Sequence, residues 1–190
     1  DKTVCIVMGS TKQKQKIKTE LQKQPLMCGS IDTKLKDKVK WLGQILSTNG
    51  LADSVAATVA AREDKILAAC REMGQIVSDW RTHLVGGMDT ALFLWESCCI
   101  PSLLNGAGTW TEINTVTVKR LNKLQCWYLR LALQVGPGAA RASLLWDTAC
   151  WDMEIRIWRQ KILLVLHFRS MDQNSLAYLI YVLLNKYTLF

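Results

Sequence analysis

The spacing of apolar residues changes near residue 50 and divides the chain into two parts. In the first part, short apolar runs predict strands over residues 2–8, 25–31 and 38–46. A stretch rich in Lys and Gln, residues 11–24, separates the first two runs and predicts a solvated loop or a short surface helix. After a turn signal at residues 48–50 the period becomes helical. The sequence therefore predicts an α+β fold that is mainly α, with short antiparallel strands followed by a helical bundle.

The longest predicted helix begins at Asp53 or Ser54. Its apolar residues fall within about 60° of one line when each residue turns the helix by about 100°. They are Val55, Val59, Ile66, Met73, Ile76, Val77, Trp80 and Leu84. Arg62 lies in the same stripe instead of opposite to it. Two explanations stay open: the stem of Arg62 snorkels at the end of the core, which we favour, or the stripe faces a charged partner.

Breakers and capping residues predict the remaining helices. We expect one helix from Asp89 to residue 104, which Pro101 kinks or places at a close helix crossing. Thr111, with Glu112 nearby, is expected to cap the next helix, and residues 136–138 to end it. Further helices are predicted over residues 141–148, 151–168 and 174–184. The helix that follows Thr111 is expected to bury Val116, Leu121, Leu124, Trp127, Tyr128 and Leu131. The helix over residues 151–168 is expected to bury Trp158, Ile162, Val165 and Leu166.

The net charge of +8 is concentrated at the beginning of the chain. Residues 1–50 hold ten Lys and four acidic residues, which is six of the eight excess charges. Such asymmetry indicates a polyanionic partner, either nucleic acid or an anionic membrane surface, and a solvated basic face is the alternative. The longest uncharged apolar run near the end, residues 176–184, is too short to cross a bilayer, so we expect no membrane contact.

The candidate chemistry is sparse. None of the seven Cys has Cys-x-x-Cys spacing, and only two His are present, so we expect reduced, structural cysteines in a nuclear or cytoplasmic protein. Residues 9–12 lack the spacing of a phosphate-binding loop, and His83 and His167 have no nucleophile at a suggestive position. Nothing in the sequence indicates a self-contained enzyme. Because the chain opens with Asp1 and three short strands cannot cover their own faces, we expect a fragment of a longer protein.

Four strings occur in a fixed order along the chain: Asp1-Lys2-Thr3, Lys40-Trp41-Leu42-Gly43, residues 100–110 and residues 121–131. This order resembles the C-terminal part of the reverse transcriptases of non-LTR (LINE-type) retrotransposons. Their motifs are an Asn-x-x-Lys-Thr strand, a Lys-Tyr-Leu-Gly primer-grip strand, a Pro-x-Leu-Leu-Tyr-Gly-x-x-x-Trp signature and the helix after it. The resemblance covers roughly residues 1–165.

The resemblance implies an RNA-directed DNA polymerase divided into the end of the palm with primer-grip-like strands (residues 1–50), a helical thumb-like bundle (51–170) and a tail of unknown role (171–190). Lys2 matches the lysine proposed to protonate the leaving pyrophosphate, although an exposed chain-end Lys is the alternative. Trp41, Leu42 and Gly43 match the primer grip, with core packing as the alternative for Trp41. The thumb of the family holds a template–primer duplex. The expected nucleic-acid contacts are Lys2, Lys38, Lys40, Trp41, Leu42, Gly43, Arg62, Lys119, Arg120 and Lys123, and a solvated face is the alternative for the last three.

Two departures from the family limit the expected activity. Polymerase chemistry needs carboxylates that hold two divalent ions about 4 Å apart, and no Asp-Asp or Asp-x-Asp pair occurs in this chain. We therefore expect no cofactor here, Mg²⁺ only in the complete polymerase, and no catalysis by this chain alone. Trp41 and Asn105 also stand where the family has Tyr.

The expected partners are an RNA–DNA or DNA duplex and the upstream palm and fingers of the same polyprotein. The alternative function is a helical protein-interaction or dimerisation module derived from a retroelement, with a possible homo-oligomer formed through the apolar tail. The tail after Met171 matches no motif of the family.

Overall fold

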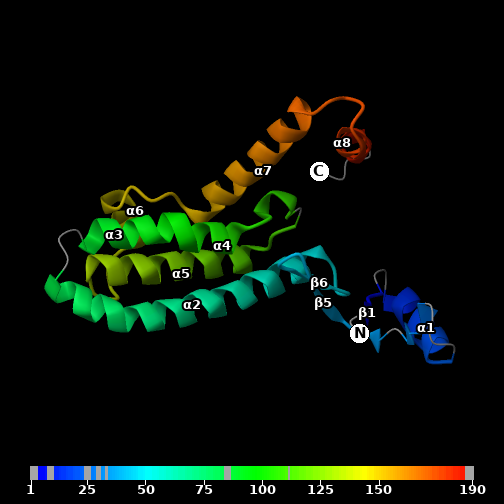
Figure 1. Ribbon diagram of the computed structural model, residues 1–190, viewed down its shortest axis with the longest axis horizontal. Helices are drawn as coiled ribbons and strands as arrows, with labels where there is room; N and C mark the ends of the chain where they lie inside the picture. The colour runs from blue at the N-terminus through cyan, green and yellow to red at the C-terminus, as the bar shows by residue number, and fades with distance from the viewer. Residues whose placement is uncertain are drawn as a thin grey trace.

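The computed structural model describes residues 4–7, 11–23, 27–28, 31–32, 34–83, 87–110 and 112–186. Helices dominate this part of the chain, and short strands occur only before residue 48, which confirms the predicted α+β, mainly α fold (Figure 1). The helices are α1 (Thr11–Lys23), α2 (Leu51–His83), α3 (Gly87–Leu94), α4 (Ile100–Leu104), α5 (Thr115–Leu133), α6 (Arg141–Asp147), α7 (Met153–Ser170) and α8 (Leu176–Lys186), with a π-helical turn η1 (Trp95–Cys99) and a 3₁₀ turn η2 (Ala107–Thr109).

The described strands form three separate pairs. β1 (Val4–Cys5) runs parallel to β4 (Lys34–Leu35), and β2 (Met27–Cys28) runs antiparallel to β3 (Ile31–Asp32). The single strand predicted over residues 38–46 is wrong, because this segment is a hairpin of β5 (Lys38–Trp41) and β6 (Gln44–Ser47). The Lys- and Gln-rich stretch forms helix α1, one of its two predicted alternatives.

A two-residue turn makes the hairpin. Leu42 (φ 46°) and Gly43 (φ 80°) both adopt positive φ, as a type I′ turn between two right-twisted strands requires. Gly43 takes this conformation without steric cost, whereas Leu42 does not. Leu42-Gly43 lacks the Asn-Gly or Asp-Gly pair that marks such a turn, so apolar periodicity alone predicts a continuous strand here.

Helix α2 is the longest element and packs along the bundle of α3–α4 and α5 (Figure 1). Val55, Val59 and Ile66 of its predicted stripe are buried, as expected. The predicted stripe residues 73, 76, 77, 80 and 84 lie outside the residues whose side chains are described. Trp95 stacks on Tyr128 with ring centroids 4.6 Å apart, and the other fully buried large side chains of the core are Trp110, Leu103, Leu121, Leu129, Leu144 and Met153.

Pro101 changes the helical geometry before it. The π-helical turn Trp95–Cys99 separates α3 from α4, and Pro101 stands in the first turn of α4. Proline lacks an N–H, and in a regular α-helix its ring would crowd the carbonyl of Ser97, four residues earlier. A π turn is one way in which a helix accommodates such an interruption. The expected disturbance at Pro101 is thus a local change of helix type.

Two predicted ends of α5 were wrong. Asn114 caps the helix, since its side chain accepts a 2.7 Å hydrogen bond from the Thr117 N–H, and Thr111 lies outside the described residues. The helix ends at Leu133, where Gln134 (φ 56°) takes the left-handed conformation before the Gly-Pro-Gly segment begins. Asn is a strong N-cap and also precedes the first helical turn at the right position.

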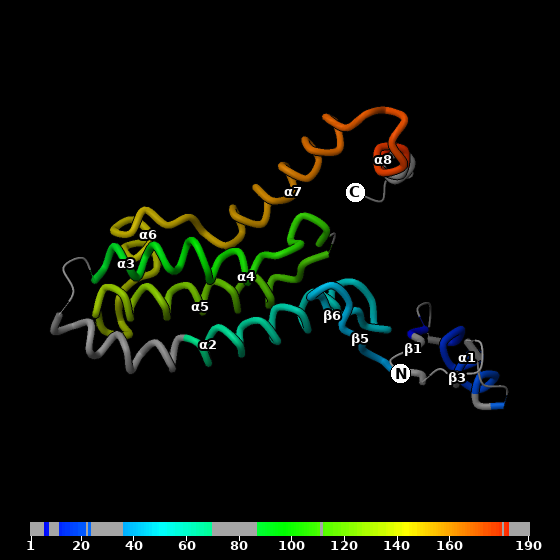
Figure 2. Tube along the Cα trace, in the orientation of Figure 1, coloured from blue at the N-terminus to red at the C-terminus, as the bar shows by residue number. Residues whose placement is uncertain are grey.

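Helix α7 leaves the bundle after its first turns and carries α8 beyond it (Figure 2). Its buried side chains are Met153 and Ile157. The predicted apolar face is exposed instead: Trp158, Ile162 and Leu166 are each more than half exposed. Val116, Trp127 and Leu131 of α5 are exposed as well, contrary to expectation. Among the described helices, none is long and apolar enough to cross a bilayer.

Candidate nucleic-acid interface

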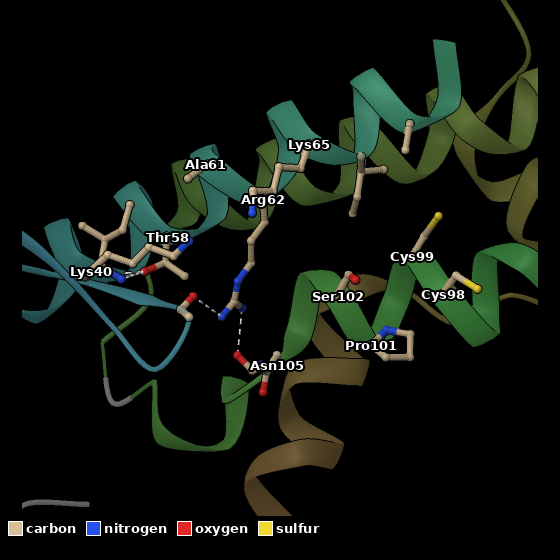
Figure 3. A pocket seen from close by; sticks show the side chains of 14 residues that line it. Lys40, Thr58, Ala61, Arg62, Lys65, Cys98, Cys99, Pro101, Ser102 and Asn105 are labelled. Atoms are coloured by element: carbon tan, nitrogen blue, oxygen red, sulfur yellow. Dashed lines mark hydrogen bonds between the residues drawn. The ribbon is translucent and has the colours of Figure 1, made fainter. Parts of the chain in front are cut away.

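Arg62 joins the β5–β6 hairpin to the bundle. Arg62 is 9% exposed, and its guanidinium carbon lies 5.9 Å from the ring centroid of Trp110. It donates to the backbone carbonyls of Leu103 (2.9 Å), Asn105 (2.8 Å) and Gly43 (3.0 Å). Figure 3 shows the bond to Asn105. Burial lowers the pKa of Arg62 from its ordinary value, but an arginine remains charged in proteins. Arg62 forms no ion pair with a described carboxylate. Because the residue is buried, its charged group does not snorkel to the surface, contrary to the explanation favoured from the sequence.

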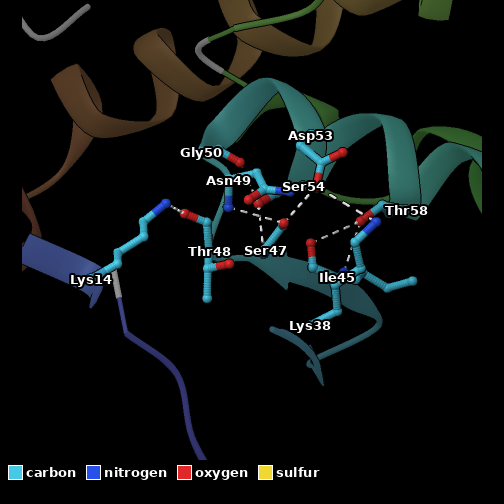
Figure 4. Close-up of polar contacts among 10 residues, drawn as sticks. All are labelled: Lys14, Lys38, Ile45, Ser47, Thr48, Asn49, Gly50, Asp53, Ser54 and Thr58. Atoms are coloured by element: carbon cyan, nitrogen blue, oxygen red, sulfur yellow. Dashed lines mark hydrogen bonds and ion pairs between the residues drawn. The ribbon is translucent and has the colours of Figure 1, made fainter. Parts of the chain in front are cut away.

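Ser54 and Thr58 of α2 lie along the outer edge of β6 (Figure 4), and Arg62 continues this line of polar residues to the hairpin turn. Ser54, Thr58 and Arg62 are four residues apart, which is about 6 Å along a helix, and alternate strand residues are about 6.6 Å apart. The helix repeat and the strand repeat therefore match over three successive contacts. The bonds are Ser47 N–H to Ser54 Oγ (2.8 Å), Ile45 N–H to Thr58 Oγ1 (2.7 Å) and Arg62 Nη2 to Gly43 O.

This arrangement brings together two of the strings that carry the resemblance. The Asn105-Gly106 turn packs on the hairpin tip: a Cβ added to Gly43 would lie 3.9 Å from Asn105 Nδ2, and one added to Gly106 would overlap with Gln44 Nε2. Gly106 also has a φ of 72°. The hairpin tip is thus fixed against the segment 100–110, about sixty residues later in the chain.

A groove of about 790 Å³ opens between the hairpin, α2 and the η1–α4 segment. Its charged lining residues are Lys40, Arg62 and Lys65, and none of its lining residues is acidic. Thr58, Ser102 and Asn105 supply the polar groups, and the rest of the lining is apolar apart from Cys98, Cys99 and Gly43. Figure 3 shows Lys40 and Lys65 on either side of Arg62, with Ser102 and Asn105 on the opposite wall. The groove is therefore suited to an anion.

The predicted hairpin residues lie at the surface beside this groove. Alternation along β5 places Lys38 and Lys40 on one face and Trp41 on the other. Trp41 is 61% exposed and Leu42 is 77% exposed, so Trp41 is not a core residue. Lys38 Nζ lies 3.5 Å from Asp53 Oδ2. The pKa of Asp53 is lowered, mainly by the hydrogen bond from the Ser47 hydroxyl and to a lesser extent by Lys38.

The predicted residues of α5 form a second group. Lys119, Arg120 and Lys123 are all exposed. Arg120 pairs with Glu63 of α2, the residue next to Arg62. Lys119 lines a second hollow, of about 410 Å³, between α5 and α7, which also contains Lys161. Lys119 and Lys123 form no ion pair with the residues that the structure describes. The last predicted residue, Lys2, lies outside the described residues.

Sequence reasoning missed three residues of this region. Ser54 and Thr58 share the four-residue spacing of Arg62, and that line was visible in the sequence once Arg62 was singled out. Lys65 lies three residues after Arg62 and therefore on the neighbouring part of the same helix face. Its position in the groove depends on α4, which no local pattern places there.

No family model, curated protein or solved structure matches this chain. Within the described part of the chain, no three His, Cys, Asp or Glu side chains are grouped so that they could hold a metal ion. The groups gathered at the hairpin and the groove are cations, hydroxyls, an amide and an exposed aromatic ring. Side chains of these kinds are the ones that contact phosphates and sugars in protein–nucleic acid complexes.

Proposed function

We propose that this chain is the nucleic-acid-binding C-terminal portion, the palm end and thumb, of an RNA-directed DNA polymerase of the non-LTR retrotransposon kind. In this role it holds a template–primer duplex while the upstream palm and fingers supply the catalytic carboxylates and Mg²⁺. The observation that supports the proposal most is the pairing of the hairpin tip with the segment 100–110 through Arg62. Two of the resembled strings thereby meet at a basic groove.

The exposed cations would bind by neutralising phosphates. Lys40 on the hairpin and Lys119 and Lys123 on α5 are exposed and without a carboxylate partner among the described residues, so each can replace a counterion on a nucleic-acid backbone. Lys38 and Arg120 are partly neutralised by Asp53 and Glu63 and contribute less. Binding of this kind is independent of sequence and weakens steeply with salt.

The hairpin tip would supply the non-ionic contacts. Trp41 presents a largely exposed ring, which can pack against a sugar or stack on a base. Gly43 lets a backbone approach closely. The donors of Arg62 to Gly43, Leu103 and Asn105 are used inside the protein, so we assign Arg62 a positioning role instead of direct contact. The protein would work in the nucleus or cytoplasm, where cysteines stay reduced; Cys98, Cys126 and Cys150 form no disulfide with the residues that the structure describes.

A filter-binding titration with a short RNA–DNA hybrid tests the proposal. We expect binding that falls steeply as salt rises and that is the same for unrelated sequences. A hybrid that is not retained at low salt would contradict it.

One observation favours the alternative function, a protein-interaction or dimerisation module. The arm formed by α7 and α8 exposes a set of large apolar side chains, and exposed apolar patches mark interaction surfaces. They are Trp158, Ile162, Leu163, Leu166, Leu176, Leu179 and Val182. Light scattering distinguishes the two functions: a dimer that Ile162→Asp converts into a monomer supports the module, whereas a monomer that binds the hybrid removes it.

A further inference from the structure

We propose that the groove between the hairpin, α2 and α4 binds one single strand of nucleic acid, with Lys40 and Lys65 on its phosphates. This inference rests on the proposed nucleic-acid-binding function and adds to it a site for an unpaired segment, which adjoins the duplex-binding surface and shares Lys40 with it. Lys65, Ser102 and Asn105 would then be binding residues that the resemblance does not indicate.

The charge of the groove indicates an anionic occupant. Lys40, Arg62 and Lys65 bring three positive charges to one concave surface, and none of its lining residues is acidic. Arg62 contacts carbonyl dipoles and the face of the Trp110 ring, and pairs with no carboxylate among the described residues. Cations gathered without counter-charges repel one another, and a phosphate between them relieves that repulsion.

The shape and lining favour a single strand over a duplex. A duplex presents its phosphates on a broad convex surface and can touch only the rim of a groove. A single strand can enter it, because its unstacked bases and sugars can lie against apolar walls while its phosphates stay near cations. Ile45, Ile66 and Pro101 provide such walls here, and Figure 3 shows Ser102 and Asn105 facing the cations across the groove. Both residues are exposed and can hydrogen-bond to the strand.

A protein segment rich in acidic residues is the competing occupant. Such a segment would complement the positive charge of the groove. However, only its carboxylates would be attracted to Lys40 and Lys65, so it would need an acidic residue at nearly every position. Nucleic acid carries one phosphate for every nucleotide regardless of sequence. We therefore commit to the single strand and include an acidic peptide in the test.

The experiment measures fluorescence anisotropy of labelled dT8 and rU8, and separately of an RNA–DNA hybrid, with the full chain at several salt concentrations. Lys65→Gln removes a groove cation, and Lys16→Gln on the exposed face of α1 is the matched control. Ser102→Leu is the second variant, because it narrows the groove from the opposite wall without changing the charge. For single strands, losing one phosphate contact lowers the slope of log K against log salt by about 0.7.

We expect Lys65→Gln to weaken binding of dT8 and rU8 several-fold and to lower the salt slope by about 0.7. Ser102→Leu should weaken octamer binding without changing the salt slope. Lys16→Gln should leave both the affinity and the salt slope unchanged. Hybrid binding should change less in each variant. If the hybrid binds but both groove variants bind the octamers like the native chain, the groove assignment is overturned and the proposed function stands. If a poly-glutamate peptide binds and neither nucleic acid does, both are overturned.

Discussion

The guanidinium of Arg62 donates a 3.0 Å hydrogen bond to the carbonyl oxygen of Gly43 at the tip of the β5–β6 hairpin. The same group donates to the carbonyl of Asn105, so one buried cation holds two turns that lie about sixty residues apart in the chain. Because Lys40 and Trp41 sit on that hairpin, their position relative to the bundle depends on Arg62. The proposed interface is therefore built on an internal hydrogen-bond network.

Replacing Arg62 should destabilise the fold. Arg62→Met leaves three carbonyls without their donor, and an unsatisfied buried polar group costs about 1–3 kcal/mol, so we expect the free energy of unfolding to fall by about 2–4 kcal/mol. Arg62→Lys keeps the charge but loses the planar fork, and should recover only part of this loss. Urea denaturation measures both.

The control for this series is Arg120→Met. Arg120 pairs with Glu63 at the surface, and an exposed ion pair contributes about 0–1 kcal/mol. Equal losses for Arg62→Met and Arg120→Met would contradict the role given to Arg62.

The hydrogen bonds between α2 and the edge of β6 predict that Thr58→Val lowers the stability of the fold. Thr58 is buried, and its hydroxyl accepts from the Ile45 N–H at 2.7 Å. Valine has the same shape but leaves this N–H without a partner, so the free energy of unfolding should fall by about 1–3 kcal/mol. Amide hydrogen exchange at Ile45 should become faster. Thr19→Val on the exposed face of α1 is the control, and unchanged exchange at Ile45 in Thr58→Val would refute the contact.

Close packing of η2 on α7 predicts that Gly108 does not tolerate a side chain. A Cβ at this position would lie 3.1 Å from the carbonyl oxygen of Gln160 and 3.2 Å from the Leu164 Cβ. We expect Gly108→Ala to lower the free energy of unfolding by about 1–3 kcal/mol, because backbone atoms must move apart. Gly136→Ala has open space around the new methyl group and should change stability little. Thermal unfolding of the two variants makes the comparison.

The ionised form of Asp53 should stabilise the protein in a defined pH range. Its pKa lies below the ordinary value of 3.8, mainly because the Ser47 hydroxyl donates to it and also because Lys38 is near. A lowered pKa in the folded state stabilises the protein above the unfolded pKa, and this contribution is lost as the pH falls through the folded pKa. Asp53→Asn should therefore be less stable than the native chain at pH 7 and nearly equal to it near pH 2. A difference that does not shrink with falling pH would exclude this linkage.

The sequence predicts the helices well because their signals are local. The period of α2 places Val55, Val59 and Ile66 in the core, and all three are buried. The same period singled out Arg62 but not its partners, because those are backbone carbonyls that no residue type specifies. The Leu42-Gly43 turn was missed since leucine rarely takes positive φ.

Apolar periodicity also does not say whether a face is covered. Trp158, Ile162 and Leu166 of α7 form a regular stripe, yet they are exposed because the helix leaves the bundle after its first turns. The predicted contacts that the structure describes lie on the β5–β6 hairpin, α2 and α5, which the sequence could indicate from local patterns. The sequence does not indicate Lys65 as a groove residue, because its position there follows from the tertiary packing of α4 against α2.

The most direct test of the proposed function is the salt dependence of RNA–DNA hybrid binding by the native chain and by Lys40→Gln, Lys119→Gln and Lys123→Gln. Each phosphate contact contributes about 0.9 to the slope of log K against log salt on B-DNA. We predict a steep slope for the native chain, a decrease of about that size in each variant, and no dependence on sequence. A hybrid that does not bind, or that binds with the same slope in all four proteins, would contradict the proposal.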